Sequence, residues 1–155
     1  MQTLETIKQL YDYNIWANAA LLRYFQSAAR ADEKAVRVFA HLLLSEKIWL
    51  RRMSNENSDN TGNDFWAGET VNLCAALFEE NRLAFDKFFS DLTEDILDAS
   101  FAYKNSRGAA FKNTARDALT HLFLHSSYHR GQAAQAIRLI GDAPPSTDFI
   151  QFLRK

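Results

Sequence analysis

The sequence contains little glycine, proline or cysteine. Its 155 residues include five Gly, two Pro and one Cys. Folds rich in β-sheet need many turns, and turns draw heavily on Gly and Pro, so this scarcity favours long helices with few connections. The single cysteine, Cys74, excludes an intramolecular disulfide framework and is typical of a reducing cytoplasm.

A long apolar run and a strong charge of one sign are also missing. The opening stretch MQTLETIKQLYDYNIW has an acidic residue at position 5 and no uninterrupted apolar segment. We therefore expect neither a signal peptide nor a membrane span. The formal net charge is −1, whereas a nucleic-acid binder needs a basic surface. These absences predict a cytoplasmic protein with no membrane partner and no nucleic-acid partner.

The charges are unevenly distributed along the chain. Residues 69–98 carry eight acidic and two basic side chains, and residues 106–140 carry five basic and one acidic side chain. One interpretation is a pair of solvated helix faces that attract each other. The other is a basic rim that draws an anionic substrate toward a site.

Apolar residues recur at three- and four-residue spacing in four long stretches, which predicts helices. The expected helices cover about residues 3–27, 32–53, 69–90 and 114–141. Asp32 is the expected N-cap of the second helix, and Gly141 is the expected left-handed residue after the fourth. The length favours one domain, residues 1–155. Four long helices with one long connection predict an all-α four-helix bundle with a long crossover.

The remaining segments are less regular. Residues 54–64, SNENSDNTGND, have the composition of a long exposed loop. Residues 91–113 show weak alternation around an Arg-Gly turn and predict either a small hairpin or an irregular crossover. The tail after Pro145 predicts one or two helical turns with Ser146 as N-cap.

Three of the four histidines lie on the fourth predicted helix at four-residue steps: His121, His125 and His129. Successive members are about 40° apart around the helix, with a rise of roughly 6 Å. His121 and His129 are thus about 12 Å apart along the axis, too far to share one ion at His–metal distances of roughly 2.0–2.1 Å. Only one adjacent pair can serve a single metal.

The apolar pattern of the same helix favours one pair. Its core-facing stripe is defined by Leu119, Leu122, Ala133, Ile137 and Ile140. On the 100° rule, His129 lies closest to this stripe, His125 flanks it, and His121 lies toward the rim. We therefore predict that His125 and His129 form the metal-binding pair, although buried structural histidines would show the same periodicity.

A catalytic metal normally has three protein ligands, and the remaining histidine is His41 on the second predicted helix. It shares one helix face with Leu44, Ser45, Ile48 and Arg52. A second apolar stripe, with Phe39, Leu42 and Trp49, lies on the other side of that helix. A helix that is apolar on two faces must be buried twice, so we expect a homodimer in which one face meets the partner. The periodicity alone leaves open which face points inward.

Two neighbours of the pair have alternative interpretations. Gln132, one turn beyond His129, is either a group that orients a ligand or bound water or a polar residue at the rim. Tyr128 is either a packing residue or a proton donor.

Four segments together resemble a known family. HSSYHRGQ at 125–132 is similar to the signature of the DinB/YfiT-like superfamily of metalloenzymes. YNIWAN at 13–18, HLLLSEKIWLRR at 41–52 and PPSTDFIQFLR at 144–154 follow its pattern elsewhere, in the same order. The resemblance covers essentially the whole chain, and the fourth-helix motif is its most specific part.

This resemblance implies a four-helix bundle with a long crossover, usually dimeric, whose metal is held by His41, His125 and His129. His121 matches a histidine that is often present in the family but is not a ligand. Characterised relatives include metal-dependent transferases and isomerases that use low-molecular-weight thiols. The implied function is therefore a divalent-metal-dependent thiol S-transferase, or a related hydrolase or isomerase, acting on a small electrophilic substrate.

Three imidazoles suit Zn²⁺ or Ni²⁺ among other divalent ions. Such an ion lowers the pKa of bound water to about 7 and deprotonates a coordinated thiol, so a thiol cosubstrate fits the open position. Arg52 and Arg130 are candidates for binding its carboxylates. The alternative function is a non-catalytic stress-response dimer that binds a metal or a small ligand, since no acidic residue accompanies the histidines in the sequence.

Overall fold

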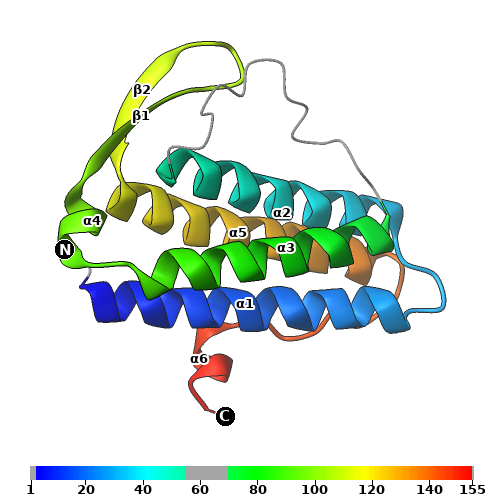
Figure 1. Cartoon of the computed structure of the whole chain (residues 1–155). Helices are drawn as coiled ribbons and strands as arrows, with labels where there is room; N and C mark the ends of the chain where they lie inside the picture. Colours follow the sequence, from blue (N-terminus) through cyan, green and yellow to red (C-terminus); the bar gives the residue numbers. More distant parts are fainter. Residues whose placement is uncertain (1–2, 55–69, 155) are drawn as a thin grey trace.

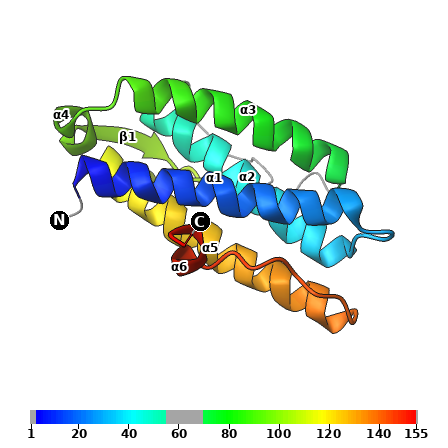
Figure 2. The same ribbon diagram turned by 90° about the horizontal axis from the view of Figure 1, so that it is seen from below.

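The computed structural model of the chain describes residues 3–54 and 70–154. Four long helices lie side by side as a bundle (Figures 1 and 2): α1 (Leu4–Ser27), α2 (Glu33–Met53), α3 (Val71–Ser90) and α5 (Ala115–Leu139). Their bounds confirm the four predicted helices to within a few residues. Figure 1 shows that α1 and α5 run in one direction and α2 and α3 in the other. Because α2 and α3 are parallel, the chain between them has to cross from one end of the bundle to the other, which confirms the predicted all-α bundle with a crossover.

Each long helix begins at a side-chain cap. Thr3, Asp32, Thr70 and Thr114 each accept a hydrogen bond from the backbone amide three residues on, which satisfies one of the unpaired amides of the first turn. The predicted cap Asp32 is confirmed. At the other end of α5, Gly141 has φ 86°, the left-handed conformation that was expected there.

The segment between α3 and α5 forms a short helix, α4 (Glu94–Asp98), and a two-stranded hairpin of β1 (Ser100–Lys104) and β2 (Ala110–Thr114). The strands are antiparallel, and Tyr103 lies opposite Phe111. Of the two interpretations of residues 91–113, the hairpin is therefore the observed one. Its turn contains Gly108 with φ 82°. The exposed loop predicted at 54–64 lies, apart from Ser54, outside the described residues.

The tail forms one short helix, α6 (Phe149–Phe152), beside α1 (Figure 2). Its rings pack against Tyr13, with centroid distances of 5.2 Å to Phe149 and 6.0 Å to Phe152. The predicted N-cap Ser146 was wrong. Asp148 occupies that position, and its backbone carbonyl accepts from the amides of Gln151 and Phe152.

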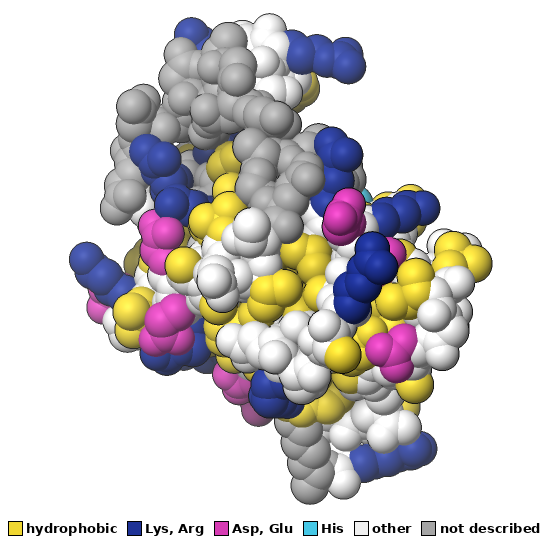
Figure 3. Space-filling model, turned by 90° about the vertical axis from the view of Figure 1, so that its right-hand side faces the viewer, with side chains coloured by type: hydrophobic (Ala, Val, Ile, Leu, Met, Phe, Trp, Pro, Cys, Tyr) yellow, Lys and Arg dark blue, Asp and Glu magenta, His cyan; other side chains and the backbone are white. Residues whose placement is uncertain are grey.

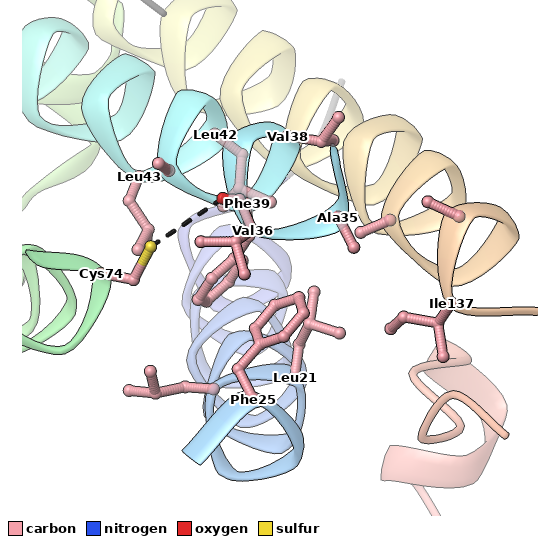
Figure 4. Close-up of a cluster of buried hydrophobic side chains, with 14 of the residues drawn as sticks. Leu21, Phe25, Ala35, Val36, Val38, Phe39, Leu42, Leu43, Cys74 and Ile137 are labelled. Carbon is pink, nitrogen blue, oxygen red and sulfur yellow. Dashed lines mark hydrogen bonds between the residues drawn. The ribbon is translucent and has the colours of Figure 1, made fainter. Parts of the chain in front are cut away.

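Two apolar clusters fill the bundle. The first lies where α2 begins and α5 ends (Figure 4), and includes Leu21, Phe25, Val36, Phe39, Leu42, Cys74 and Ile137. The second lies at the opposite end and includes Ile7, Tyr11, Phe85, Phe89, Leu119 and Leu122. In all four long helices, buried polar residues separate the two clusters: Asn14 and Asn18, Glu46, Asn81, and Ser126 and Arg130. We call this set the polar layer.

The two apolar faces of α2 are both covered within the same chain. Phe39 and Leu42 belong to the bundle core, while α2 also packs along α5 more extensively than any other pair of described elements. The expectation that one face is left for a partner subunit was therefore wrong, because α5 occupies it. A homodimer would therefore have to form through another surface of the chain.

Candidate metal centre

The packing of α2 against α5 brings three histidines together. His41 from α2 lies with its ring centroid 5.3 Å from that of His125 and 4.5 Å from that of His129, and the rings of His125 and His129 are 4.3 Å apart. Each histidine offers one nitrogen, and these nitrogens all lie within 4.8 Å of one another. Among the described residues, this is the one group of three or more His, Cys, Asp or Glu side chains with the spacing of a metal site.

The nitrogens of the fourth-helix pair already have the separation of two ligands on one ion. Nε2 of His125 lies 3.1 Å from Nε2 of His129. Two nitrogens bound tetrahedrally at roughly 2.0–2.1 Å are about 3.3–3.4 Å apart, and an octahedral pair is somewhat closer. The spacing of this pair therefore fits two ligands of one divalent ion, and the ligand nitrogen of His41 lies within 4.8 Å of both.

Gln132 fixes the orientation of one of these rings. Its Oε1 lies 2.7 Å from Nδ1 of His129. Because an amide oxygen can only accept, Nδ1 of His129 is the protonated nitrogen and its Nε2 presents a lone pair to the centre. Of the two interpretations of Gln132, the structure is consistent with the orienting one, which is how metal-binding histidines are usually held in place.

The environment favours neutral imidazoles. Burial, helped by the charges of His129, His41 and His121, lowers the pKa of His125 to about 3. Burial also lowers the pKa of His129, against a smaller opposite effect of its hydrogen bond to Gln132. Protons therefore compete weakly for these nitrogens at neutral pH, and only a neutral imidazole binds a metal.

His121 lies beside this group rather than in it. Its ring is 5.5 Å from that of His125 and 5.3 Å from that of Trp49. Burial and the charge of Arg52 lower its pKa. The predicted separation of His121 from the adjacent pair thus agrees with its position. Tyr128 lies at the rim: its side chain is 65% exposed, and its ring meets that of His129 at 5.2 Å.

The two arginines expected to bind a substrate carboxylate occupy different environments. Arg52 is buried, with its guanidinium 4.7 Å from the Trp49 ring and 4.5 Å from the Tyr103 ring. Its Nη2 donates to the carbonyl of Lys104 in the hairpin, and burial lowers its pKa. This places a buried cation near the hairpin, where its charge acts on His121.

Arg130 points into the bundle core instead. Only 2% of it is exposed, and its Nη1 donates to Oδ1 of Asn14 and of Asn18 at 2.7 and 2.8 Å. Adjacent residues on a helix point about 100° apart, so His129 can face α2 while Arg130 faces α1. The guanidinium of Arg130 is enclosed by the polar layer, so this residue is a poor candidate for binding a substrate carboxylate.

Glu46 is the main residue that the sequence interpretation missed. Its Oε1 accepts hydrogen bonds from Asn14 at 2.7 Å, from Asn18 at 2.9 Å and from Ser126 at 3.0 Å. Burial raises the pKa of Glu46, while these hydrogen bonds and the charge of Arg130 act in the opposite direction. The sequence did contain evidence for such a buried polar group. Asn14 and Asn18 interrupt the apolar stripe of the first helix, and buried amides need hydrogen-bond partners.

The polar layer links α1, α2 and α5 at the height of the histidines. Ser126 directly follows His125 and Arg130 directly follows His129, while Glu46 lies about one turn beyond His41 on α2. These hydrogen bonds are directional, so they fix how far α5 is rotated against α2. The same rotation aims His125 and His129 at His41.

A four-helix bundle with a crossover and a histidine cluster shared by two facing helices defines a class of helical proteins with a candidate metal centre in the bundle. Comparison with known proteins identifies the family. The DinB family model matches residues 1–155, and the chain belongs to the DinB family.

Two relatives illustrate this relationship. The chain is 22% identical over 171 residues to Protein DinB of Bacillus subtilis (strain 168), covering 94% of this chain and 92% of that protein. It also superimposes with a TM-score of 0.67 on the crystal structure of a DinB-like protein from Bacillus cereus ATCC 10987. That match has 19% identity and covers 94% of this chain and 97% of the other, so it establishes the fold alone. None of the helices in the described ranges combines the length and apolarity of a membrane span.

Proposed function

We propose that this protein is a divalent-metal-dependent enzyme that transfers a low-molecular-weight thiol to a small electrophile, with His41, His125 and His129 as metal ligands. The observation that carries the proposal is the convergence of these three ring nitrogens, with Gln132 holding His129 in the ligand tautomer. Membership of the DinB family supports the same class of protein but not a particular reaction.

Three neutral imidazoles leave the full positive charge on a bound Zn²⁺ or Ni²⁺, which lowers the pKa of a coordinated thiol or water. The protein's own groups supply the rest of the arrangement. Gln132 keeps the proton on Nδ1 of His129, and the polar layer keeps α5 in register with α2. Tyr128 lies at the open rim, where its hydroxyl can meet a substrate. Arg52, buried beside His121, supplies a positive charge that favours an anionic group at that end of the cluster.

The proposed reaction forms one sulfur–carbon bond between the thiol and the electrophile. The leaving group departs with its bonding electrons, and the thiol proton passes to solvent. With water in place of the thiol, the same site would catalyse hydrolysis. If the adduct of thiol and substrate instead breaks down to release the thiol and a rearranged substrate, the same site would catalyse isomerisation.

A non-catalytic role is the second candidate. It is supported by the lack, among the described residues, of an acidic side chain in the histidine cluster, since Glu46 is directed into the polar layer. In that case the site would bind a metal or a small ligand in a stress-response dimer. The homodimer itself remains a proposal and is supported by the exposed apolar side chains of α5, namely Leu124, Tyr128 and Leu139.

Metal content of the untagged protein tests the ligand assignment. We expect about one divalent ion per chain in the wild type and loss of most of it in His125→Ala and in His129→Ala. His121→Ala is the matched control, because it removes a histidine from the same helix and leaves the cluster intact. Full occupancy in the two ligand variants, or equal loss in His121→Ala, would contradict the assignment.

A thiol-transfer assay then separates the two candidate functions. The metal-loaded wild type is incubated with a thiol and a generic haloaromatic electrophile, and formation of the thioether is followed. A rate that depends on the metal and is absent in His125→Ala supports the enzyme. Tight metal binding with no metal-dependent rate for any cellular thiol favours the binding protein.

A further inference from the structure

A groove lies between α2 and α3, on the side of the bundle where α4 is found (Figure 1). It has a volume of about 600 Å³, which is within the usual range of roughly 300–1,000 Å³ for small-molecule sites. The groove-lining residues of α2, from Lys47 to Ser54, are centred about 130° around the helix from His41 on the 100° rule. The groove is therefore separate from the histidine cluster.

The walls of the groove are held by two contacts between α2 and α3. Asn81 is buried, and its Nδ2 donates to the carbonyl of Leu43 at 2.8 Å. Nearby, Nζ of Lys47 lies 2.8 Å from Oε1 of Glu80. The two helices are thus in direct contact along the groove, and its walls are already in place before a ligand binds.

The floor of the groove is apolar and is formed by Leu50, Ala84, Phe88 and Ile96. Leu50 is buried within the second apolar cluster, and Phe88 packs against that cluster. Ile96, at the α4 end, is 40% exposed. Part of this apolar surface is therefore open to solvent, and covering it with an apolar ligand would be favourable.

Two cations without an ion-pair partner flank this floor. Arg51 on α2 and Lys87 on α3 line the groove, and neither forms an ion pair with any described residue. The helices are parallel, and both cations lie beyond the Lys47–Glu80 pair in the chain direction. Of the acidic residues that line the groove in the described ranges, Glu80 is neutralised by Lys47, which leaves Asp91 against two cations.

Charged side chains alone do not mark a ligand site on this protein. Figure 3 shows Lys, Arg, Asp and Glu side chains scattered among hydrophobic ones at the opposite end of the bundle. The groove differs because Arg51 and Lys87 flank a hollowed apolar floor. Such a floor can bind an apolar body, while guanidinium and ammonium groups bind a carboxylate.

We propose that the groove between α2 and α3 is a second ligand site, which binds a small apolar molecule that carries one carboxylate. The apolar body lies on Leu50, Phe88 and Ile96, and the carboxylate lies between Arg51 and Lys87. The site uses none of the residues of the candidate metal centre, so it goes beyond the proposed function and does not depend on it.

A matched pair of ligands tests this site. The ¹⁵N-labelled full-length protein is titrated with 2-naphthoate and with 2-naphthamide, which have nearly the same shape but differ by one negative charge. Backbone amide chemical shifts report both the affinity and the location of each ligand, and we expect the largest changes at the groove residues of α2 and α3. The wild type should prefer 2-naphthoate by about three- to tenfold, the range for two solvent-accessible ion pairs, and should lose this preference at high salt.

Charge variants test the role of the two cations. Arg51→Gln/Lys87→Gln should bind both ligands with equal affinity and keep the wild-type affinity for 2-naphthamide. The control is Arg23→Gln/Lys112→Gln, which also removes one Arg and one Lys, from exposed positions on α1 and β2, and should keep the preference. Both double variants are first compared with the wild type by circular dichroism and urea unfolding.

A blocking variant tests the location independently of charge. Ala84 lines the groove and is exposed, so Ala84→Trp should fill the groove and abolish binding of both ligands. Ala76→Trp is the matched control, because it introduces the same ring at an exposed position of α3 outside the residues that line the groove. Unchanged binding by Ala84→Trp, or equal loss in both tryptophan variants, would contradict the assignment.

A carboxylate can also coordinate a metal ion, so the titration is repeated on protein treated with a chelator. The preference for 2-naphthoate should remain. Shifts centred on His41, His125 and His129 that vanish on chelation would place the ligand at the candidate metal centre and overturn the inference. Binding of neither ligand, equal binding of both by the wild type, or an equal loss of preference in the α1 and β2 control would also overturn it. Selective loss in Arg51→Gln/Lys87→Gln supports it.

Discussion

Replacing Glu46 by leucine tests the structural role of the polar layer. The change removes the oxygen that accepts from Asn14, Asn18 and Ser126. Each buried donor that loses its acceptor costs about 1–3 kcal/mol, and a well-buried leucine recovers about 1.5–3 kcal/mol. The three donors share one oxygen and can partly re-pair, so we expect a net loss of about 2–4 kcal/mol in the free energy of unfolding.

Equilibrium urea unfolding of the metal-free protein, followed by circular dichroism, measures this loss. Glu46→Gln is the matched control, because its amide keeps an acceptor oxygen and nearly the same shape. We expect it to cost at most about 1–2 kcal/mol. Small domains have a total stability of about 5–15 kcal/mol, so losses of this size can be measured while the variants still fold. A Glu46→Leu protein as stable as the wild type would refute the view that the polar layer depends on this carboxyl group.

The wild type and Glu46→Gln also provide a pH test. Burial raises the pKa of Glu46 above its ordinary value of 4.5, so above that pH the native state binds more protons than the unfolded chain. The contribution of Glu46 to the free energy of unfolding is therefore fully present below pH 4.5 and declines as the pH rises through the folded pKa. The wild type should lose stability relative to Glu46→Gln as the pH rises from 4.5 toward neutrality. A constant or opposite difference would contradict this sign.

Three further predictions concern other parts of the chain. Gln132→Ala should weaken Zn²⁺ binding by about 10- to 100-fold in a competition titration with a chelator, because a metal-bound histidine loses its orienting partner; unchanged affinity would argue against that role. Cys74 should resist alkylation by iodoacetamide in the native protein and react after unfolding, because it is buried and burial raises its pKa to about 11; rapid native-state labelling would contradict this. Arg116 lowers the pKa of Glu94 and Asp98, so their contribution to stability is present above their ordinary pKa values and is lost as the pH falls. Arg116→Gln should therefore reduce the acid dependence of unfolding, and an unchanged profile would disprove the coupling.

The long helices could be predicted because their signals are local. Asp32 accepts from the amide three residues on, as expected of an N-cap, and Gly141 takes the left-handed conformation after α5. Helix geometry also limits one metal to an adjacent histidine pair, and the apolar stripe of the same helix separates His121 from His125 and His129. The hydrogen bonds within one helix and the angular positions of its residues depend little on the tertiary contacts of the rest of the chain.

Features that depend on how two helices face each other could not be predicted in this way. Periodicity showed that α2 is apolar on two faces, but it could not show that α5 covers the second face. Glu46 gave no signal of its own, since a single acidic residue on a largely buried helix has no preferred direction until its neighbours are placed. The environment of Arg130 was missed for the same reason: it follows His129 in the sequence, but the 100° step turns its side chain toward α1.

The position of the polar layer suggests why the bundle tolerates buried polar groups at all. Apolar side chains pack without strong directional preference, so a purely apolar core would allow α5 to rotate against α2 at little cost. A metal site shared by two helices requires a defined rotation, because its ligands must be held within about 0.5 Å of the binding geometry. Three hydrogen bonds tie α5 to its neighbours at the height of the histidines: Ser126 donates to Glu46 on α2, and Arg130 donates to Asn14 and Asn18 on α1. Each of them is lost if α5 turns. The buried hydrogen bonds thus fix the geometry of the candidate centre in a way that the two apolar clusters on either side of it cannot.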